Sequence, residues 1–163
     1  MLNILIANKS WSAIGWMKAF VLIELIHLAV VLFLESCVQM GFFNRPIDAR
    51  SSYYSERGIY LDYMLGAIIN PLLENIFLCL PAKYFIKLEW PNWIIYIIAS
   101  APLAITHWYT VSWMSFFASW PFFGISLYYF KKVSLSENSF SRGFVFSYLI
   151  HAANNTIFLS FRE

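Results

Sequence analysis

The chain has 163 residues, of which 60% are hydrophobic, 20% are aromatic and only 12% are charged. Because about one quarter of the residues in soluble domains are charged, this composition excludes an ordinary water-soluble domain and predicts an integral membrane protein. The formal net charge of +2 comes from scattered basic residues, which excludes a nucleic-acid partner. A membrane-spanning helix needs about 20 residues, so we predict an all-α fold: one membrane domain, residues 1–163, that is a multi-pass bundle of about five transmembrane helices.

The amino-terminal half contains two apolar segments and the longest polar loop. Residues 1–11 are a short apolar start that we place at the membrane interface. The first span covers residues 14–40, which is too long for the core of a signal peptide. Residues 41–58 form the main loop outside the membrane. Residues 59–88 form a second apolar region, and its two internal prolines are expected to kink the helix.

The carboxyl-terminal half contains three more predicted spans. The third covers residues 93–109 and follows a polar turn. The fourth, residues 113–130, is rich in aromatic side chains, which we expect to face lipid and the membrane interface. It ends at two lysines, and a polar turn, residues 134–142, then leads into the fifth span at residues 142–163.

The distribution of basic residues predicts the orientation. Seven lie on the side that holds the amino terminus, against four on the other side, which favours a cytoplasmic amino terminus. We expect a bacterial inner (plasma) membrane. The first set is Lys9, Lys18, Lys83, Lys87, Lys131, Lys132 and Arg142, and the second is Arg45, Arg50, Arg57 and Arg162.

Polar side chains inside the apolar segments are the candidates for function. All three histidines of the chain, His27, His107 and His151, lie in such segments. His151 and Asn155 are four residues apart and share one face of a helix, with Asn154 beside them. Polar groups at this depth are costly, so they usually face a bundle interior or a wet cavity.

The predicted spans also bring an acidic side chain to the level of a histidine. Glu74 lies 14 residues before Leu88, and His107 lies 14 residues after Trp93, where the next helix enters from the same side. At 1.5 Å per residue, both lie about 20 Å below that surface. His151 follows Gly143 by 8 residues, so three helices can bring their polar side chains to a similar level.

This set of residues favours hydrolysis by an activated water molecule. A buried glutamate can act as general base, and histidine and asparagine can donate hydrogen bonds to a developing oxyanion. Ser100, Ser147 and Cys79 lack the context of a nucleophile motif such as G-x-S-x-G. H-E-x-x-H is absent, and we expect no metal and no cofactor.

Three segments resemble the motifs of the CPBP family of glutamic intramembrane proteases, also called the Abi or CAAX-protease-like family. They are NPLLENIFLC at residues 70–79, LAITH at residues 103–107 and HAANN at residues 151–155. The family pattern is EExxxR, FxxxH and HxxxN on successive helices. The resemblance covers residues 66–161, with Pro71 before Glu74 as in the family.

The resemblance implies a role for each matching residue. Glu74 would activate the water, His107 would assist it, and His151 and Asn155 would position the water and stabilise the oxyanion. Asn70, Asn75 and Asn154 would support them. Three positions depart from the pattern: Asn75 replaces the second glutamate, Cys79 the arginine and Leu103 the aromatic residue. The implied substrate is a membrane-anchored protein or peptide in the lipid bilayer, and a partner membrane subunit stays open.

Other interpretations remain at this stage. A catalytically silent relative would bind a peptide or partner protein, as in self-immunity, and a small transporter or proton relay would use the buried Glu and His side chains. His27 is expected to form a helix–helix hydrogen bond. Glu24 and His27 form an ExxH pair, which is a di-iron ligand signature, but the matching second pair is missing.

Overall fold

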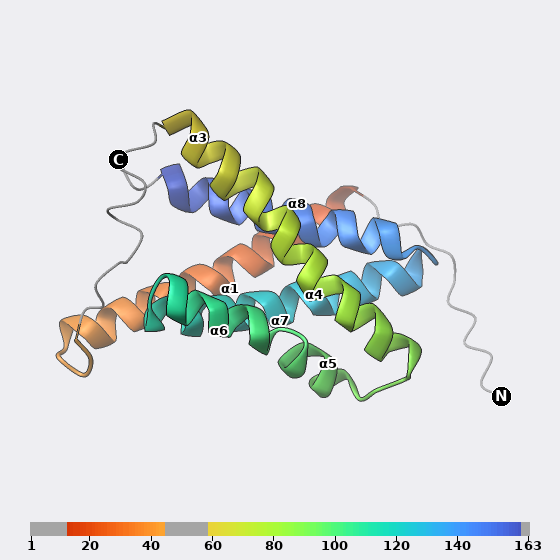
Figure 1. Ribbon diagram of the computed structural model, residues 1–163, viewed down its shortest axis with the longest axis horizontal. Helices are drawn as coiled ribbons and strands as arrows, with labels where there is room; N and C mark the ends of the chain where they lie inside the picture. The colour runs from red at the N-terminus through yellow and green to blue at the C-terminus, as the bar shows by residue number, and fades with distance from the viewer. Residues whose placement is uncertain (1–12, 45–58, 161–163) are drawn as a thin grey trace.

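The computed structural model describes residues 13–44 and 59–160 and is drawn in Figure 1. Within these ranges the chain is helical and has no strand, which confirms the all-α prediction for them. The elements are α1 (Ala13–Gln39), α3 (Ile59–Tyr63), the π-helix η1 (Met64–Ile69), α4 (Asn70–Lys87), α5 (Asn92–Ile98), α6 (Ala101–Thr110), α7 (Trp113–Ser136) and α8 (Phe140–Ser160). The predicted interfacial start at residues 1–11 and loop residues 45–58 lie outside the described residues.

Two helical segments are long and apolar enough to cross a membrane. They are Ile14–Gln39, with 26 residues, and Met64–Lys87, with 24 residues. The second combines η1 and α4, which follow each other without a gap. Pro81 lies inside α4, and the helix continues through it to Lys87. Among the described residues, length and mean hydropathy thus identify two candidate spans.

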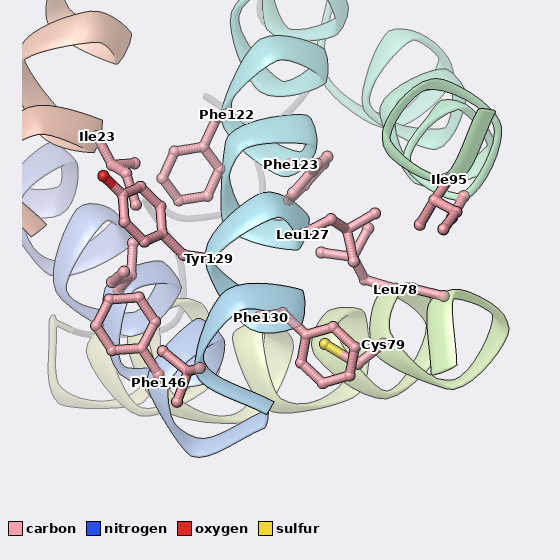
Figure 2. Close-up of a cluster of buried hydrophobic side chains, with 14 of the residues drawn as sticks. Ile23, Leu78, Cys79, Ile95, Phe122, Phe123, Leu127, Tyr129, Phe130 and Phe146 are labelled. Atoms are coloured by element: carbon pink, nitrogen blue, oxygen red, sulfur yellow. The ribbon is translucent and has the colours of Figure 1, made fainter. Parts of the chain in front are cut away.

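The helix α7 lies at the centre of the hydrophobic core. It contacts α1, α4, α5, α6 and α8. Figure 2 shows its aromatic side chains packed with side chains from neighbouring helices. Phe122, Phe123 and Phe130 are 3%, 1% and 1% exposed. Our expectation that the aromatic residues of this helix face lipid is therefore wrong for its middle, because a helix that is apolar all round is surrounded by other helices.

The third predicted span, residues 93–109, is not one continuous helix. It consists of α5 and α6, separated by a two-residue turn. Pro102 has no backbone N–H and so cannot bond to the carbonyl of Ile98 four residues earlier. At the break, the hydroxyl of Ser100 donates to the carbonyl of Tyr96. The break separates α6, which carries His107, from the direction of α5, as Figure 1 shows.

The predicted polar turn at residues 134–142 is largely helical. The helix α7 continues past the two lysines to Ser136, and α8 begins at Phe140. The reversal occurs between them, where Asn138 has φ +49°. Asparagine tolerates this left-handed conformation better than most residues do, so three residues suffice for the connection.

Candidate functional site

Glu74 lies between two histidines from different helices. Its carboxylate projects from α4, with Oε2 3.0 Å from Nε2 of His151 on α8 and Oε1 3.9 Å from Nε2 of His107 on α6. The side chains of Glu74 and His107 are 19% and 16% exposed, whereas that of His151 is 3% exposed. The carboxylate thus has a buried side at His151 and a side nearer the surface at His107.

Asn75 is completely buried beside Glu74 and joins α4 to α8. Its amide nitrogen lies 2.8 Å from the carbonyl oxygen of Pro71 and 3.0 Å from Nδ1 of His151. Its amide oxygen accepts the hydroxyl of Ser147 at 2.6 Å. Sequence reasoning did not include Ser147, although its spacing of four residues from His151 indicated a shared helix face. These contacts form a buried polar layer that ends at the Glu74 carboxylate.

The ring of His107 is oriented by its own helix. Its Nδ1 lies 2.9 Å from the carbonyl oxygen of Leu103, one turn earlier. A carbonyl oxygen only accepts, so Nδ1 carries the hydrogen and Nε2 of the neutral ring presents a lone pair toward Glu74 Oε1. The distance of 3.9 Å between these two atoms exceeds that of a direct hydrogen bond. It suits a water molecule that donates one hydrogen to each atom.

Asn155 is joined to the π-helix η1. Its Nδ2 donates to the carbonyl oxygen of Gly66 at 2.8 Å. In η1 a backbone N–H bonds five residues back, as Asn70 does to Leu65. The corresponding donor for the Gly66 carbonyl would be residue 71, which is a proline without an N–H. The Asn155 amide takes the position that Pro71 leaves open, so one of its amide hydrogens is used within the fold.

A second buried polar contact joins α1 to α8. Nδ1 of His27 lies 2.8 Å from Oδ1 of Asn154, which is the helix–helix hydrogen bond expected of this histidine. One turn earlier, Oε1 of Glu24 is buried and has no hydrogen-bond partner in the part of the chain that the structure describes. In that same part, no three His, Cys, Asp or Glu side chains are grouped to hold a metal ion. Asn70 is half-buried and contributes no side-chain hydrogen bond to either group.

Two adjacent phenylalanines of α7 contact all three histidines. The Phe123 ring centroid is 5.3 Å from those of His107 and His151, in edge-on geometry. The Phe122 centroid is 5.5 Å from that of His151 and 5.1 Å from that of His27. Sequence reasoning missed both residues, because nothing in an aromatic-rich helix distinguishes a ring beside a site from a ring in the core.

Comparison of the chain with family models, with curated proteins and with solved structures finds no match in any of the three. The resemblance to the CPBP family therefore rests on residues 70–79, 103–107 and 151–155 themselves. From these segments the structure brings together Glu74, His107 and His151.

Proposed function

We propose that this protein is a glutamic-type intramembrane endopeptidase that hydrolyses a peptide bond of a membrane-anchored protein or peptide. The proposal is carried by the position of the Glu74 carboxylate, 3.0 Å from Nε2 of His151 and 3.9 Å from Nε2 of His107. The resemblance of the three segments to CPBP motifs supports it. A carboxylate next to an imidazole lone pair is suited to activating water.

The same proposal includes a multi-pass arrangement in a membrane. Only 17% and 33% of the apolar windows of the two candidate spans are buried within the protein. Large apolar side chains of α1 are about half exposed or more, and soluble monomers rarely expose continuous apolar surfaces of this kind. They include Leu25, Leu28, Leu32 and Phe33. Lipid would cover these surfaces, and α5 with α6, α7 and α8 would complete five crossings.

In the proposed reaction, a water molecule between Glu74 and His107 donates a hydrogen bond to each. Glu74 takes one proton from this water as the water oxygen bonds to the substrate carbonyl carbon and the carbonyl electron pair moves to oxygen. That pair then re-forms the C=O bond, the C–N bond breaks, and Glu74 gives its proton to the leaving nitrogen. His151 and the second amide hydrogen of Asn155 are assigned to the developing oxyanion. One water is consumed, and Glu74 ends as it began.

A second candidate function is binding of a peptide or partner protein without hydrolysis. It is favoured by the uncharged side chains at two charged positions of the family's first motif, Asn75 and Cys79, both of which are buried. Asn155 also has one amide hydrogen committed to Gly66. Under this function the buried polar layer would serve as a rigid recognition surface.

Replacing Glu74 by glutamine separates the two functions. We expect Glu74→Gln to lower the rate of peptide cleavage by about 10²- to 10⁴-fold, because the amide cannot take the proton from water. The measurement uses purified protein in liposomes with a panel of lipid-anchored and membrane-spanning peptides in ¹⁸O water. Mass spectrometry should find one ¹⁸O atom in each new carboxylate. Glu89→Gln is the matched control, because Glu89 is exposed in the turn after α4. Undiminished cleavage by Glu74→Gln would refute the hydrolase, whereas unchanged peptide binding without cleavage in either protein would favour the second function.

A further inference from the structure

We propose that Asn75 is a positioning residue that holds His151 in one neutral tautomer, with its hydrogen on Nε2. In this tautomer His151 can donate to Glu74 but cannot take a proton from it at that nitrogen. The catalytic consequence rests on the proposed hydrolase function, whereas the tautomer itself follows from the directions of the hydrogen bonds around Asn75.

The contact with Pro71 determines which end of the Asn75 amide is nitrogen. The carbonyl oxygen of Pro71 accepts and cannot donate, so the Asn75 atom 2.8 Å away is the N–H donor. The opposite amide atom is then the oxygen, and it accepts the hydroxyl of Ser147 at 2.6 Å. An inverted amide would bring two oxygens together at Pro71. The orientation of this buried amide thus follows from a backbone atom that has only one possible role.

The second amide hydrogen of Asn75 determines the state of His151. The same Asn75 nitrogen lies 3.0 Å from Nδ1 of His151, so Nδ1 is the acceptor and carries no hydrogen. The neutral ring therefore has its hydrogen on Nε2, which lies 3.0 Å from Glu74 Oε2. Adding a proton to Nδ1 would set two hydrogens against each other inside a site where Asn75 is completely buried.

The two histidines beside Glu74 then have opposite tautomers. His107 has its hydrogen on Nδ1, which faces the carbonyl of Leu103 at 2.9 Å, and its Nε2 accepts. His151 has its hydrogen on Nε2, which donates. One face of the carboxylate thus receives a hydrogen bond, and the other faces a lone pair that needs a donor such as water.

This division assigns separate steps to the two rings. While Glu74 is ionised, His151 donates to its Oε2 atom. When Glu74 has taken a proton from water, that carboxyl is a weaker acceptor, and the His151 N–H is available to the negatively charged oxygen of the substrate. His151 gains and loses no proton in this sequence. Asn75 is therefore expected to matter for catalysis although it touches neither water nor substrate.

Nitrogen NMR of the protein in nanodiscs tests the tautomer directly. Because the chain has 3 histidines, ¹⁵N-labelled histidine gives few ring signals, and His27→Gln and His107→Gln assign them. We expect His151 to show a protonated Nε2 and an unprotonated Nδ1, with a scalar coupling across the hydrogen bond from the Asn75 side-chain nitrogen to Nδ1. A protonated Nδ1 in the wild-type protein, or an absent coupling, would overturn the proposal.

Asn75→Asp tests the positioning role with a side chain of the same size. Aspartate offers oxygens and no N–H, and the Ser147 hydroxyl still donates to it, so we expect Nδ1 of His151 to gain a hydrogen. We also expect cleavage to fall by about 10²- to 10⁴-fold, as when a catalytic imidazole is held in the wrong proton state. An Nδ1 that stays unprotonated in this variant would contradict the role of Asn75.

Ser147→Ala is the matched control, because it removes a contact of Asn75 without changing either amide N–H. We expect the His151 signals of Ser147→Ala to match the wild type, and a change of tautomer there would contradict the proposal. If Asn75→Asp does not fold, the wild-type coupling decides alone. Coupling without cleavage of any peptide would refute the endopeptidase and keep the tautomer, and cleavage without coupling would do the reverse.

Discussion

Pro71 shapes the site through a hydrogen bond that it cannot make. Its missing N–H leaves the Gly66 carbonyl without a backbone donor in the π-helical pattern of η1, and Asn155 supplies the donor at 2.8 Å. Its own carbonyl accepts from Asn75 at 2.8 Å. One proline thus determines the partner of Asn155 on one side and the orientation of Asn75 on the other. This explains why a proline three residues before Glu74 is compatible with a helix that must present two polar side chains.

We expect the contributions of Pro71 and Asn155 to stability to depend on each other. Asn155→Ala leaves the buried Gly66 carbonyl without a donor and should lower the free energy of unfolding by about 1–3 kcal/mol. In the Pro71→Ala background, residue 71 has an N–H for that carbonyl, so the cost of Asn155→Ala should shrink. Reversible unfolding of the two single variants and the double variant in mixed detergent measures this coupling. Strictly additive costs would show that the two groups do not share the carbonyl.

Close approach of α8 to α7 holds His151 in the site. At Gly143, in the first turn of α8, an added Cβ would lie 2.0 Å from Ser134 Oγ and 2.6 Å from the carbonyl oxygen of Phe130. Glycine is required there because backbone and not only a flexible side chain occupies the space. The packing at this point sets where α8 runs, and hence the position of His151 two turns later.

We expect Gly143→Ala to destabilise the fold by about 1–3 kcal/mol, because the crowded helices must move apart. The same separation should weaken the contact of His151 with Glu74 and lower cleavage. Gly124→Ala is the control, since its Cβ would meet only the Tyr96 carbonyl oxygen at 3.6 Å, an ordinary contact. Thermal unfolding followed by circular dichroism compares the two. Equal melting temperatures for Gly143→Ala and Gly124→Ala would contradict the proposed role of the close approach.

At the scale of the whole molecule, α1 belongs to the same core as the helices that carry the site. Ala19 and Ile23 of α1 are part of the hydrophobic cluster around α7, and His27 bonds to Asn154 on α8 at 2.8 Å. The family resemblance begins at residue 66, so it did not include this helix. The structure makes α1 a support for α8, one turn from His151.

A double-mutant cycle of His27→Ala and Asn154→Ala should show a coupling energy of about 0.6 kcal/mol, and at most about 1.7 kcal/mol, as for hydrogen bonds between membrane helices. Unfolding in mixed detergent supplies the four free energies. The pair His27→Ala and Thr156→Ala is the control and should be additive, because the Thr156 hydroxyl donates to the Ala152 carbonyl of its own helix. A coupling as small as in the control pair would remove α1 from the support of α8.

The sequence by itself determined the helical class and the candidate residues, because both depend on local features. Apolar runs of about 20 residues predict helices, and a polar side chain within such a run is costly unless it has a function or a partner. Glu74, His107, His151 and Asn155 were identified in this way. The boundaries at Leu88 and Trp93 were also close to the ends of α4 and α5.

Only the tertiary structure decided which groups meet, because a hydrogen bond between helices depends on their rotation and spacing and not on the order of residues. It joined Asn155 to Gly66 and not to Glu74, and it buried the aromatic residues of α7 instead of exposing them. It also showed Asn75 donating to both Pro71 and His151. A helical pattern states which residues share a face, but the neighbour across that face is chosen by the packing of the whole bundle.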